Sequence, residues 1–127
     1  MIFVDTNVFI YAVGRAHPLR PVARRFFEQA GSRDRLCTSA EVLQELLHAY
    51  VQVGRIATLD AARALVAGRV ETVWPIEWPD VEFARQLLDR FPGLGARDLL
   101  HLACCKRRGA SNIQTFDRAL AAAFSQG

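Results

Sequence analysis

The sequence of 127 residues is about half hydrophobic (51%) and carries a formal net charge of +3, with a pI of about 9.1. A chain of this length buries roughly two thirds of its unfolded surface as one domain, and half-apolar composition excludes a disordered protein. No apolar run approaches the roughly 18 residues of a membrane span and no signal peptide precedes the first strand, so we expect one cytoplasmic domain over residues 1–127.

The cysteines and arginines indicate the cellular compartment and the kind of binding partner. Three cysteines fit a reducing compartment, because an odd number cannot all pair internally, and the adjacent Cys104 and Cys105 lack zinc-site spacing. We therefore expect buried, inert thiols. Lys106 is the only lysine, and arginine matches phosphate geometry in a bidentate way, so nucleic acid is a natural partner class. An arginine-rich genome with an ordinary solvated surface explains the charge equally well.

The chain begins with an unbroken apolar run, residues 2–4, typical of a short strand buried on both faces of a parallel sheet. The run stops at Asp5, and a helix is expected from Val8 to Val13, ended by Gly14. Asp5 thus lies at the carboxyl end of an inner strand, where open α/β sheets keep their ligand crevices. A carboxylate there is either a helix cap or a working group.

Strands and helices alternate along the rest of the chain. The first half is expected to hold a helix from Pro21 to Gly31, a strand over residues 36–38 and a long helix from Ser39 to about Val53. The second half is expected to hold a helix over 58–67, an edge strand over 72–74, helices over 79–88 and 96–108, a strand over 112–115 and a last helix over 118–124. This alternation predicts a three-layer α/β/α sandwich around a short, mainly parallel sheet.

Acidic side chains recur where these strands end or helices begin. Asp5 and Asp117 each follow a short strand, Asp98 lies in the first turn of a helix, and either Glu41 or Glu45 leans over the sheet from a shared helix face. If these ends converge, the carboxylates repel one another, and Mg²⁺ or Mn²⁺ is the ligand that carboxylate oxygens and water suit. Taken singly, each residue is also explained as a helix cap, a group that interacts with a helix dipole or a solvated charge.

The ordered set of motifs resembles PIN-domain nucleases, in particular the VapC toxins of bacterial toxin–antitoxin pairs. The matching pieces span the whole chain: Phe3-Val-Asp-Thr-Asn7, Val42-Leu-Gln-Glu-Leu46, Arg97-Asp-Leu-Leu-His-Leu-Ala103 and Thr115-Phe-Asp-Arg118. The resemblance implies a PIN-like fold in which Asp5, Glu45, Asp98 and Asp117 bind Mg²⁺ or Mn²⁺, and it favours Glu45 over Glu41. It also implies that Thr6, Asn7 and Thr115 support the site.

The activity that the resemblance implies is metal-assisted hydrolysis of RNA phosphodiester bonds by an endoribonuclease. The partners it implies are RNA, a small antitoxin and a second copy of the chain in a homodimer. Candidate groove residues for the antitoxin, which core packing also explains, are Phe26, Phe27, Leu46, Leu47, Tyr50 and Val51. Arginines expected to hold the RNA backbone are Arg15, Arg24, Arg25, Arg107 and Arg108.

Two other readings compete with the nuclease. Phosphatases with an aspartyl nucleophile require a second Asp two residues after the first, and Asn7 occupies that position here. A non-catalytic RNA-binding or scaffold domain on the same fold would use the basic charge equally well, since fold does not fix function. RNA degradation that depends on a metal and stops with a chelator separates this second reading from the nuclease.

Overall fold

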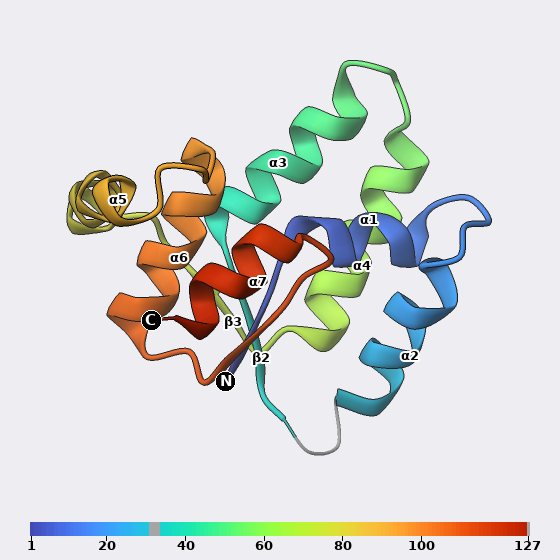
Figure 1. Cartoon of the computed structure of the whole chain (residues 1–127). Coiled ribbons are helices and arrows are strands. Elements are labelled where there is room, and N and C mark those ends of the chain that lie inside the picture. Colours follow the sequence, from blue (N-terminus) through green and yellow to red (C-terminus); the bar gives the residue numbers. More distant parts are fainter. Residues whose placement is uncertain (31–33, 127) are drawn as a thin grey trace.

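The computed structural model describes residues 1–30 and 34–126 and builds them around a parallel sheet. In chain order the elements are β1 (Ile2–Val4), α1 (Thr6–Val13), α2 (Arg20–Ala30), β2 (Leu36–Ser39), α3 (Ala40–Val51), α4 (Ile56–Arg69), β3 (Thr72–Trp74), α5 (Trp78–Arg90), α6 (Ala96–Arg108), β4 (Asn112–Gln114) and α7 (Arg118–Ser125). The expected alternation of strands and helices is confirmed (Figure 1). The helix stop expected at Gly31 lies outside the described residues.

The sheet has the strand order β3-β2-β1-β4, and all neighbouring strands are parallel. β1 pairs with β2 through Ile2 and Leu36 and with β4 through Phe3 and Ile113. Phe3 and Val4 are completely buried, as expected for an inner strand with helices on both faces. β3 is the edge strand that the proline after Trp74 predicts.

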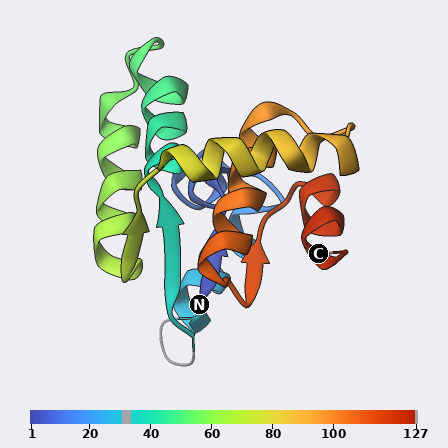
Figure 2. The same ribbon diagram turned by 90° about the vertical axis from the view of Figure 1, so that its left-hand side faces the viewer.

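Helices cover both faces of this sheet. α1 contacts α2, α3 and α4, whereas α6 contacts α5 and α7. Figure 2 shows α5 and α6 in front of the strands and α1 and α2 behind them. The three-layer α/β/α arrangement is therefore confirmed. The strands all point the same way, so every connection that leaves a strand starts at the same edge of the sheet.

Local capping shifts several helix starts from the expected positions. α1 begins at Thr6 because the Asp5 carboxylate accepts a hydrogen bond from the Thr6 backbone N–H. α4 begins at Ile56 and ends at Arg69, so the expected limits at residues 58 and 67 were too narrow. α5 begins at Trp78 because Glu77 and Asp80 form a reciprocal capping box.

Cys37, Cys104 and Cys105 are free and buried, as expected for inert thiols. Burial raises the pKa of the Cys37 and Cys104 thiols to about 11, so both stay protonated at neutral pH. Among residues 1–30 and 34–126, no helix is both long and apolar enough to cross a membrane.

Candidate functional site

The carboxyl end of β1 places Asp5 in a buried position beside the end of β4. The Asp5 backbone N–H donates to the Gln114 carbonyl at 3.0 Å, which continues the β1–β4 pairing by one residue. The Thr115 hydroxyl donates to Asp5 Oδ2 at 2.6 Å. Asp5 is only 5% exposed and also caps α1, so the cap and the working-group readings both apply to the same carboxylate.

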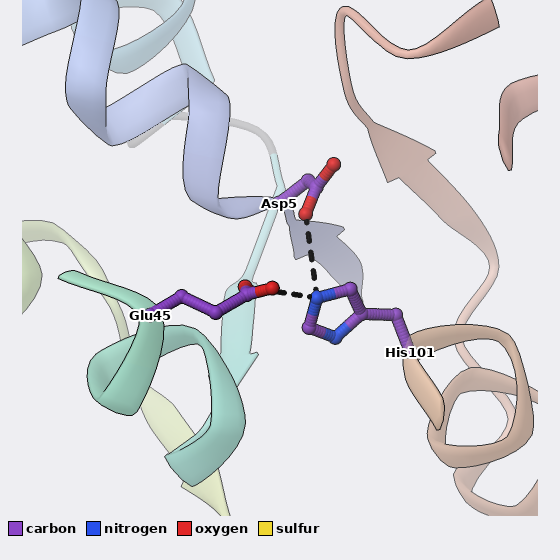
Figure 3. A group of neighbouring side chains, drawn as sticks. All are labelled: Asp5, Glu45 and His101. Carbon is purple, nitrogen blue, oxygen red and sulfur yellow. Dashed lines mark hydrogen bonds and ion pairs between the residues drawn. The ribbon is translucent and has the colours of Figure 1, made fainter. Parts of the chain in front are cut away.

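Glu45 reaches from α3 toward Asp5, and the His101 ring lies between the two carboxylates (Figure 3). The Thr6 hydroxyl donates to Glu45 Oε2, and His101 Nε2 lies 3.1 Å from Glu45 Oε2 and 3.6 Å from Asp5 Oδ1. One ligand atom from each of Asp5, Glu45 and His101 falls within 4.8 Å of the others, which is a spacing that a metal ion can bridge. Glu41 lies one turn earlier, in the first turn of α3.

Asp98 and Asp117 complete the acidic cluster. Asp98 lies in the first turn of α6, and Asp117 caps α7 by accepting a hydrogen bond from the Leu120 N–H at 3.1 Å. Burial, and then the negative charges of Asp117 and Asp5, raise the pKa of Asp98 to about 6. The side chains that define this acidic site, Asp5, Glu45, Asp98 and Asp117, therefore come from four separate segments and interact at one edge of the sheet.

The pKa values of the site residues show how its charges are balanced. Burial raises the pKa of Asp5 although His101 and Thr115 oppose the change. Burial acts in the same direction on Glu45, but hydrogen bonds from His101 and Thr6 hold the pKa of Glu45 below its usual value. Burial disfavours the charged form of His101, yet Glu45 and Asp5 raise its pKa above the ordinary value. Arg97 adds a partial counter-charge, with Nε 3.8 Å from Glu45 Oε1.

This donor set suits a hard divalent cation. The carboxylates offer oxygen ligands at the open edge of the sheet. Burial, together with the charges of Asp117 and Asp5, raises the pKa of Asp98, and a bound cation would offset this cost of ionisation. His101 adds a nitrogen, which Mn²⁺ and other transition metals accept more readily than Mg²⁺ does. The residues present thus form an acidic cluster that could bind a metal ion.

His101 is the site residue that the sequence reasoning missed. Its side chain is 1% exposed, and its Nδ1 has no hydrogen-bond partner among the residues that the structure describes. The available signal was its spacing from Asp98, because residues i and i+3 share one face of a helix. A histidine there either neutralises the carboxylates or acts as a ligand beside them.

The supporting residues expected from the sequence lie around the same edge. The Thr115 hydroxyl donates a hydrogen bond to Asp5 and accepts one from the Asp117 backbone N–H at 3.0 Å, so one hydroxyl connects two of the acidic residues. Asn7 Nδ2 lies 3.5 Å from the Thr115 hydroxyl oxygen, and Asn7 Oδ1 accepts the Phe116 N–H at 3.2 Å. These bonds fasten the start of α1 to the segment after β4.

The expected RNA-binding arginines lie in different surroundings. Arg15 is exposed in the loop after α1, and Arg24 and Arg25 are exposed on α2. Arg107 and Arg108 instead bind the buried Asp80, at 2.5 Å and 2.6 Å. An RNA phosphate near α6 would have to compete with that carboxylate. RNA binding by these five arginines stays a prediction.

Comparisons with known proteins show the family to which the chain belongs. The family model described as "PIN domain" matches residues 2–124. The chain is 64% identical over 125 residues to Ribonuclease VapC23 of Mycobacterium tuberculosis, with 98% of each protein covered. It is 44% identical over 119 residues to Ribonuclease VapC13 of the same organism, covering 93% of this chain and 91% of the relative.

Solved structures show the same fold at lower identity. Mycobacterium tuberculosis VapC20, described as a sarcin-ricin loop cleaving toxin, superposes with a TM-score of 0.82 at 23% identity, covering 97% of this chain and 95% of that one. A chain of the VapBC2 structure from Rickettsia felis, bound to a promoter DNA fragment, gives a TM-score of 0.69 at 17% identity, covering 90% and 86%.

Proposed function

The chain belongs to the PIN-domain family and to its VapC ribonucleases, and on that premise we propose that residues 1–127 act as one metal-dependent endoribonuclease domain, the toxin of a type II toxin–antitoxin pair. The observation that carries the proposal is the acidic site, in which carboxylates from four distant segments meet at one edge of the sheet. The chain's thiols, all free and buried, are compatible with a cytoplasmic setting, which we also propose.

In this proposal Asp5, Glu45, Asp98 and Asp117 would hold Mg²⁺ or Mn²⁺ in the acidic site. A bound divalent cation supplies a water of lowered pKa and positive charge that offsets the charge developing on the phosphate. Thr115 and Thr6 fix the orientation of the Asp5 and Glu45 carboxylates through their hydroxyl groups. A carboxylate of the cluster also orients the attacking water or accepts its proton.

Substitution of single carboxylates tests the proposal. We expect Asp5→Asn and Asp98→Asn to lower RNA cleavage by about 100-fold or more while the fold is retained, because each removes a negative ligand without changing side-chain size. Cleavage of labelled RNA with Mg²⁺ or Mn²⁺, and with EDTA added, is the measurement. Asp60→Asn is the matched control, since Asp60 is exposed on α4 and pairs with Arg63 of the same helix.

The outcomes separate the nuclease from the binding domain. Full activity of either site variant would remove that residue from the mechanism. If the wild-type protein bound RNA but cut none with any divalent metal, the rival reading as a non-catalytic RNA-binding domain would replace the nuclease. Cleavage that continues in EDTA would support the nuclease activity but contradict its dependence on a metal ion.

We further propose that the antitoxin lays a helix into an apolar cleft between α1, α2 and α4. The cleft has a volume of about 400 Å³ and is lined by Ala12, Ala64 and Leu65, among others, with Arg24 and Arg69 beside them. An apolar helix face flanked by acidic residues matches that lining. Of the groove residues expected from the sequence, Phe27 lines this cleft, whereas Phe26 is half-buried and does not line it. Leu46 is buried in the core, Tyr50 is largely buried and lines a different cleft, and Leu47 and Val51 are exposed.

A matched pair of alanines on α4 tests the cleft. We expect Ala64→Glu to weaken co-purification of the small protein encoded beside the chain by about tenfold or more, because it places a charge among apolar residues and near acidic partner groups. Ala67→Glu introduces the same residue at an exposed position of α4 that does not line the cleft, and should leave binding unchanged. Equal binding by both variants would show that the antitoxin does not bind in this cleft. A homodimer is the other partner state that we propose.

A further inference from the structure

A second cleft, of about 610 Å³, is lined by residues of α1, of the loop after α1, of α3 and of the turn between α3 and α4. Figure 1 shows these backbone segments. Its volume falls within the roughly 300–1,000 Å³ of small-molecule sites. Ile10 contributes an apolar side chain to the lining, Tyr11, His17 and Tyr50 contribute rings, and Arg15 and Arg55 contribute positive charge. Neither the acidic site nor the antitoxin cleft uses these residues.

The rings in this cleft are held in place by their neighbours. Tyr11 and His17 lie with their ring centroids 4.6 Å apart, at an interplanar angle of 37°. His17 is fixed in turn, since its Nδ1 accepts the Leu19 backbone N–H at 3.0 Å. The Phe116 ring also packs edge-on against Tyr11, with the ring centroids 5.5 Å apart. Tyr11 is half-buried and His17 is exposed, so part of this aromatic surface faces solvent.

The cleft lies next to the acidic site. Thr6 and Ile10 are one turn apart on α1, so both lie on one helix face, and the Thr6 hydroxyl donates to Glu45 whereas Ile10 lines the cleft. Phe116, whose ring packs against Tyr11, stands in the chain between Thr115, whose hydroxyl donates to Asp5, and Asp117. Tyr11 lies six residues after Asp5, about 9 Å along the axis of α1.

The chemistry of the lining selects its ligand. Aromatic faces bind nucleobases by stacking, and the bases of single-stranded RNA are free to stack, whereas those of a duplex are enclosed in the helix. Both charged residues that line the cleft, Arg15 and Arg55, are arginines, which favour a phosphate backbone over an acidic or neutral peptide. Arg55 also lies over the Tyr50 ring at 5.9 Å, which places its charge beside an aromatic face.

We propose that the Tyr11–His17 cleft is a base-binding subsite that holds an unpaired nucleobase of the RNA substrate beside the phosphodiester to be cleaved. This inference rests on the proposed ribonuclease function and adds to it the residues that would hold a base of the substrate, Tyr11 and His17. Stacking on the two rings positions the strand, and Arg15 and Arg55 neutralise its phosphates.

Binding without cleavage gives the direct test. A short single-stranded RNA with one 2-aminopurine is titrated with the protein in EDTA, so that the strand stays intact and quenching of the fluorescent base reports stacking. Loss of a stacking ring costs about 5- to 100-fold in affinity. We expect Tyr11→Leu to lose the quench and to raise Kd by that factor, and Tyr11→Phe, which keeps the ring, to stay within about twofold of the wild type.

Two further variants keep the test independent of folding. His17→Asn removes an exposed ring but can still accept the Leu19 N–H, so it should lower affinity without loss of stability, as unfolding curves will check. Arg55→Gln should reduce the dependence of Kd on salt, whereas Arg85→Gln should not, because Arg85 lies on α5 and pairs with Asp89. The same RNA closed into a duplex should bind without quenching.

The results distinguish this subsite from the nuclease function. Unchanged Kd and quench in both Tyr11→Leu and His17→Asn, or equal quenching by the duplex, would overturn the subsite. Metal-dependent cleavage with no quench of the single strand would keep the nuclease and remove the subsite. Quenching that depends on Tyr11 in a protein that cuts no RNA with any metal would keep the subsite and remove the nuclease.

Discussion

At the scale of the single residue, Asp98 shows most clearly that assembling the acidic site lowers the stability of the fold when its carboxylates are ionised. Its pKa is raised to about 6 by burial and by the charges of Asp117 and Asp5, whereas in the unfolded chain it stays near 3.8. The folded state therefore binds the proton more tightly, and the metal-free protein loses stability as pH rises from about 4 through 6. His101 acts in the same direction, because its raised pKa gives stability at low pH that is lost as pH rises.

We expect the free energy of unfolding of the metal-free protein to be roughly 1–2 kcal/mol larger at pH 5 than at pH 7.5, after allowance for the half-exposed position of Asp98. The protein should therefore unfold at a higher temperature at pH 5. Asp98→Asn should raise stability at pH 7.5 and flatten much of this slope, as thermal unfolding in EDTA would measure. Asp89→Asn, at an exposed ion pair, is the control. A slope in Asp98→Asn equal to that of the wild type would mean that other groups titrate. Glu45, whose pKa is lowered, acts only below this range.

The residue scale also shows how far sequence reasoning reached into the site. Asp5, Asp98 and Asp117 stood out because each follows a strand or lies in the first turn of a helix, which are positions that topology places at one edge. Glu45 lies further along α3, and the family resemblance favoured it over Glu41. His101 lies in the same motif as Asp98, but a histidine on a helix face carries no sequence signal that separates a site residue from a core residue. Its role depends on distances of 3.1 Å and 3.6 Å to Glu45 and Asp5, which fold-level reasoning does not supply.

At the scale of the elements, α5 is fastened to α6 by the buried carboxylate of Asp80. The Asp80 side chain accepts the Glu77 N–H at 2.8 Å and binds both Arg107 and Arg108. Burial opposes ionisation, but Arg108 and the Glu77 N–H lower the pKa of Asp80 to about 2. The carboxylate is thus fully ionised at neutral pH and joins three segments.

We expect Asp80→Ala to lower the free energy of unfolding by about 2–4 kcal/mol, because it leaves two arginines without their shared partner and removes the cap of α5. Asp80→Asn keeps a side-chain acceptor for the Glu77 N–H and should cost less. Asp60→Ala breaks an exposed pair and should cost at most about 0.5–1 kcal/mol. Urea unfolding measures all three. If Asp80→Ala lowered the free energy of unfolding no more than Asp60→Ala does, the two arginines would be hydrated by solvent in the variant at little cost.

Helix limits were the part of the fold that the sequence predicted least well. Periodicity placed α3 and α6 close to their observed ranges, because their apolar stripes face the core. α4 was shortened because Thr58 is a favoured cap, yet the helix starts two residues earlier with Arg55 in the cap position and no side-chain cap. The sequence did not predict the ion pairs of Asp80 for a related reason. Arg107 and Asp80 are 27 residues apart, and a pair at that separation leaves no periodic signal in the sequence.

At the scale of the whole molecule, the strand order explains why the acidic site exists. β1 lies between β2 and β4, so the helix that follows β2 and the segment that follows β4 flank the helix that follows β1. Glu45, Asp5 and Asp117 are carried by these three connections, and α6 brings Asp98 to the same edge. The sequence predicted a shared edge from the parallel sheet alone, but the strand order itself required the structure.

A ligand that binds only this assembled edge must stabilise the whole fold, and that gives the last prediction. The unfolded chain separates the four carboxylates, so Mg²⁺ or Mn²⁺ binds the native state and adds RT ln(1 + [metal]/Kd) to its stability, about 2.7 kcal/mol at 100-fold excess over Kd. For a domain of this size the melting temperature should rise by roughly 5–15 °C. Asp98→Asn and Asp5→Asn should lose most of this rise, and Asp89→Asn should keep it. No shift in the wild type at millimolar metal would mean that the acidic site does not bind these ions.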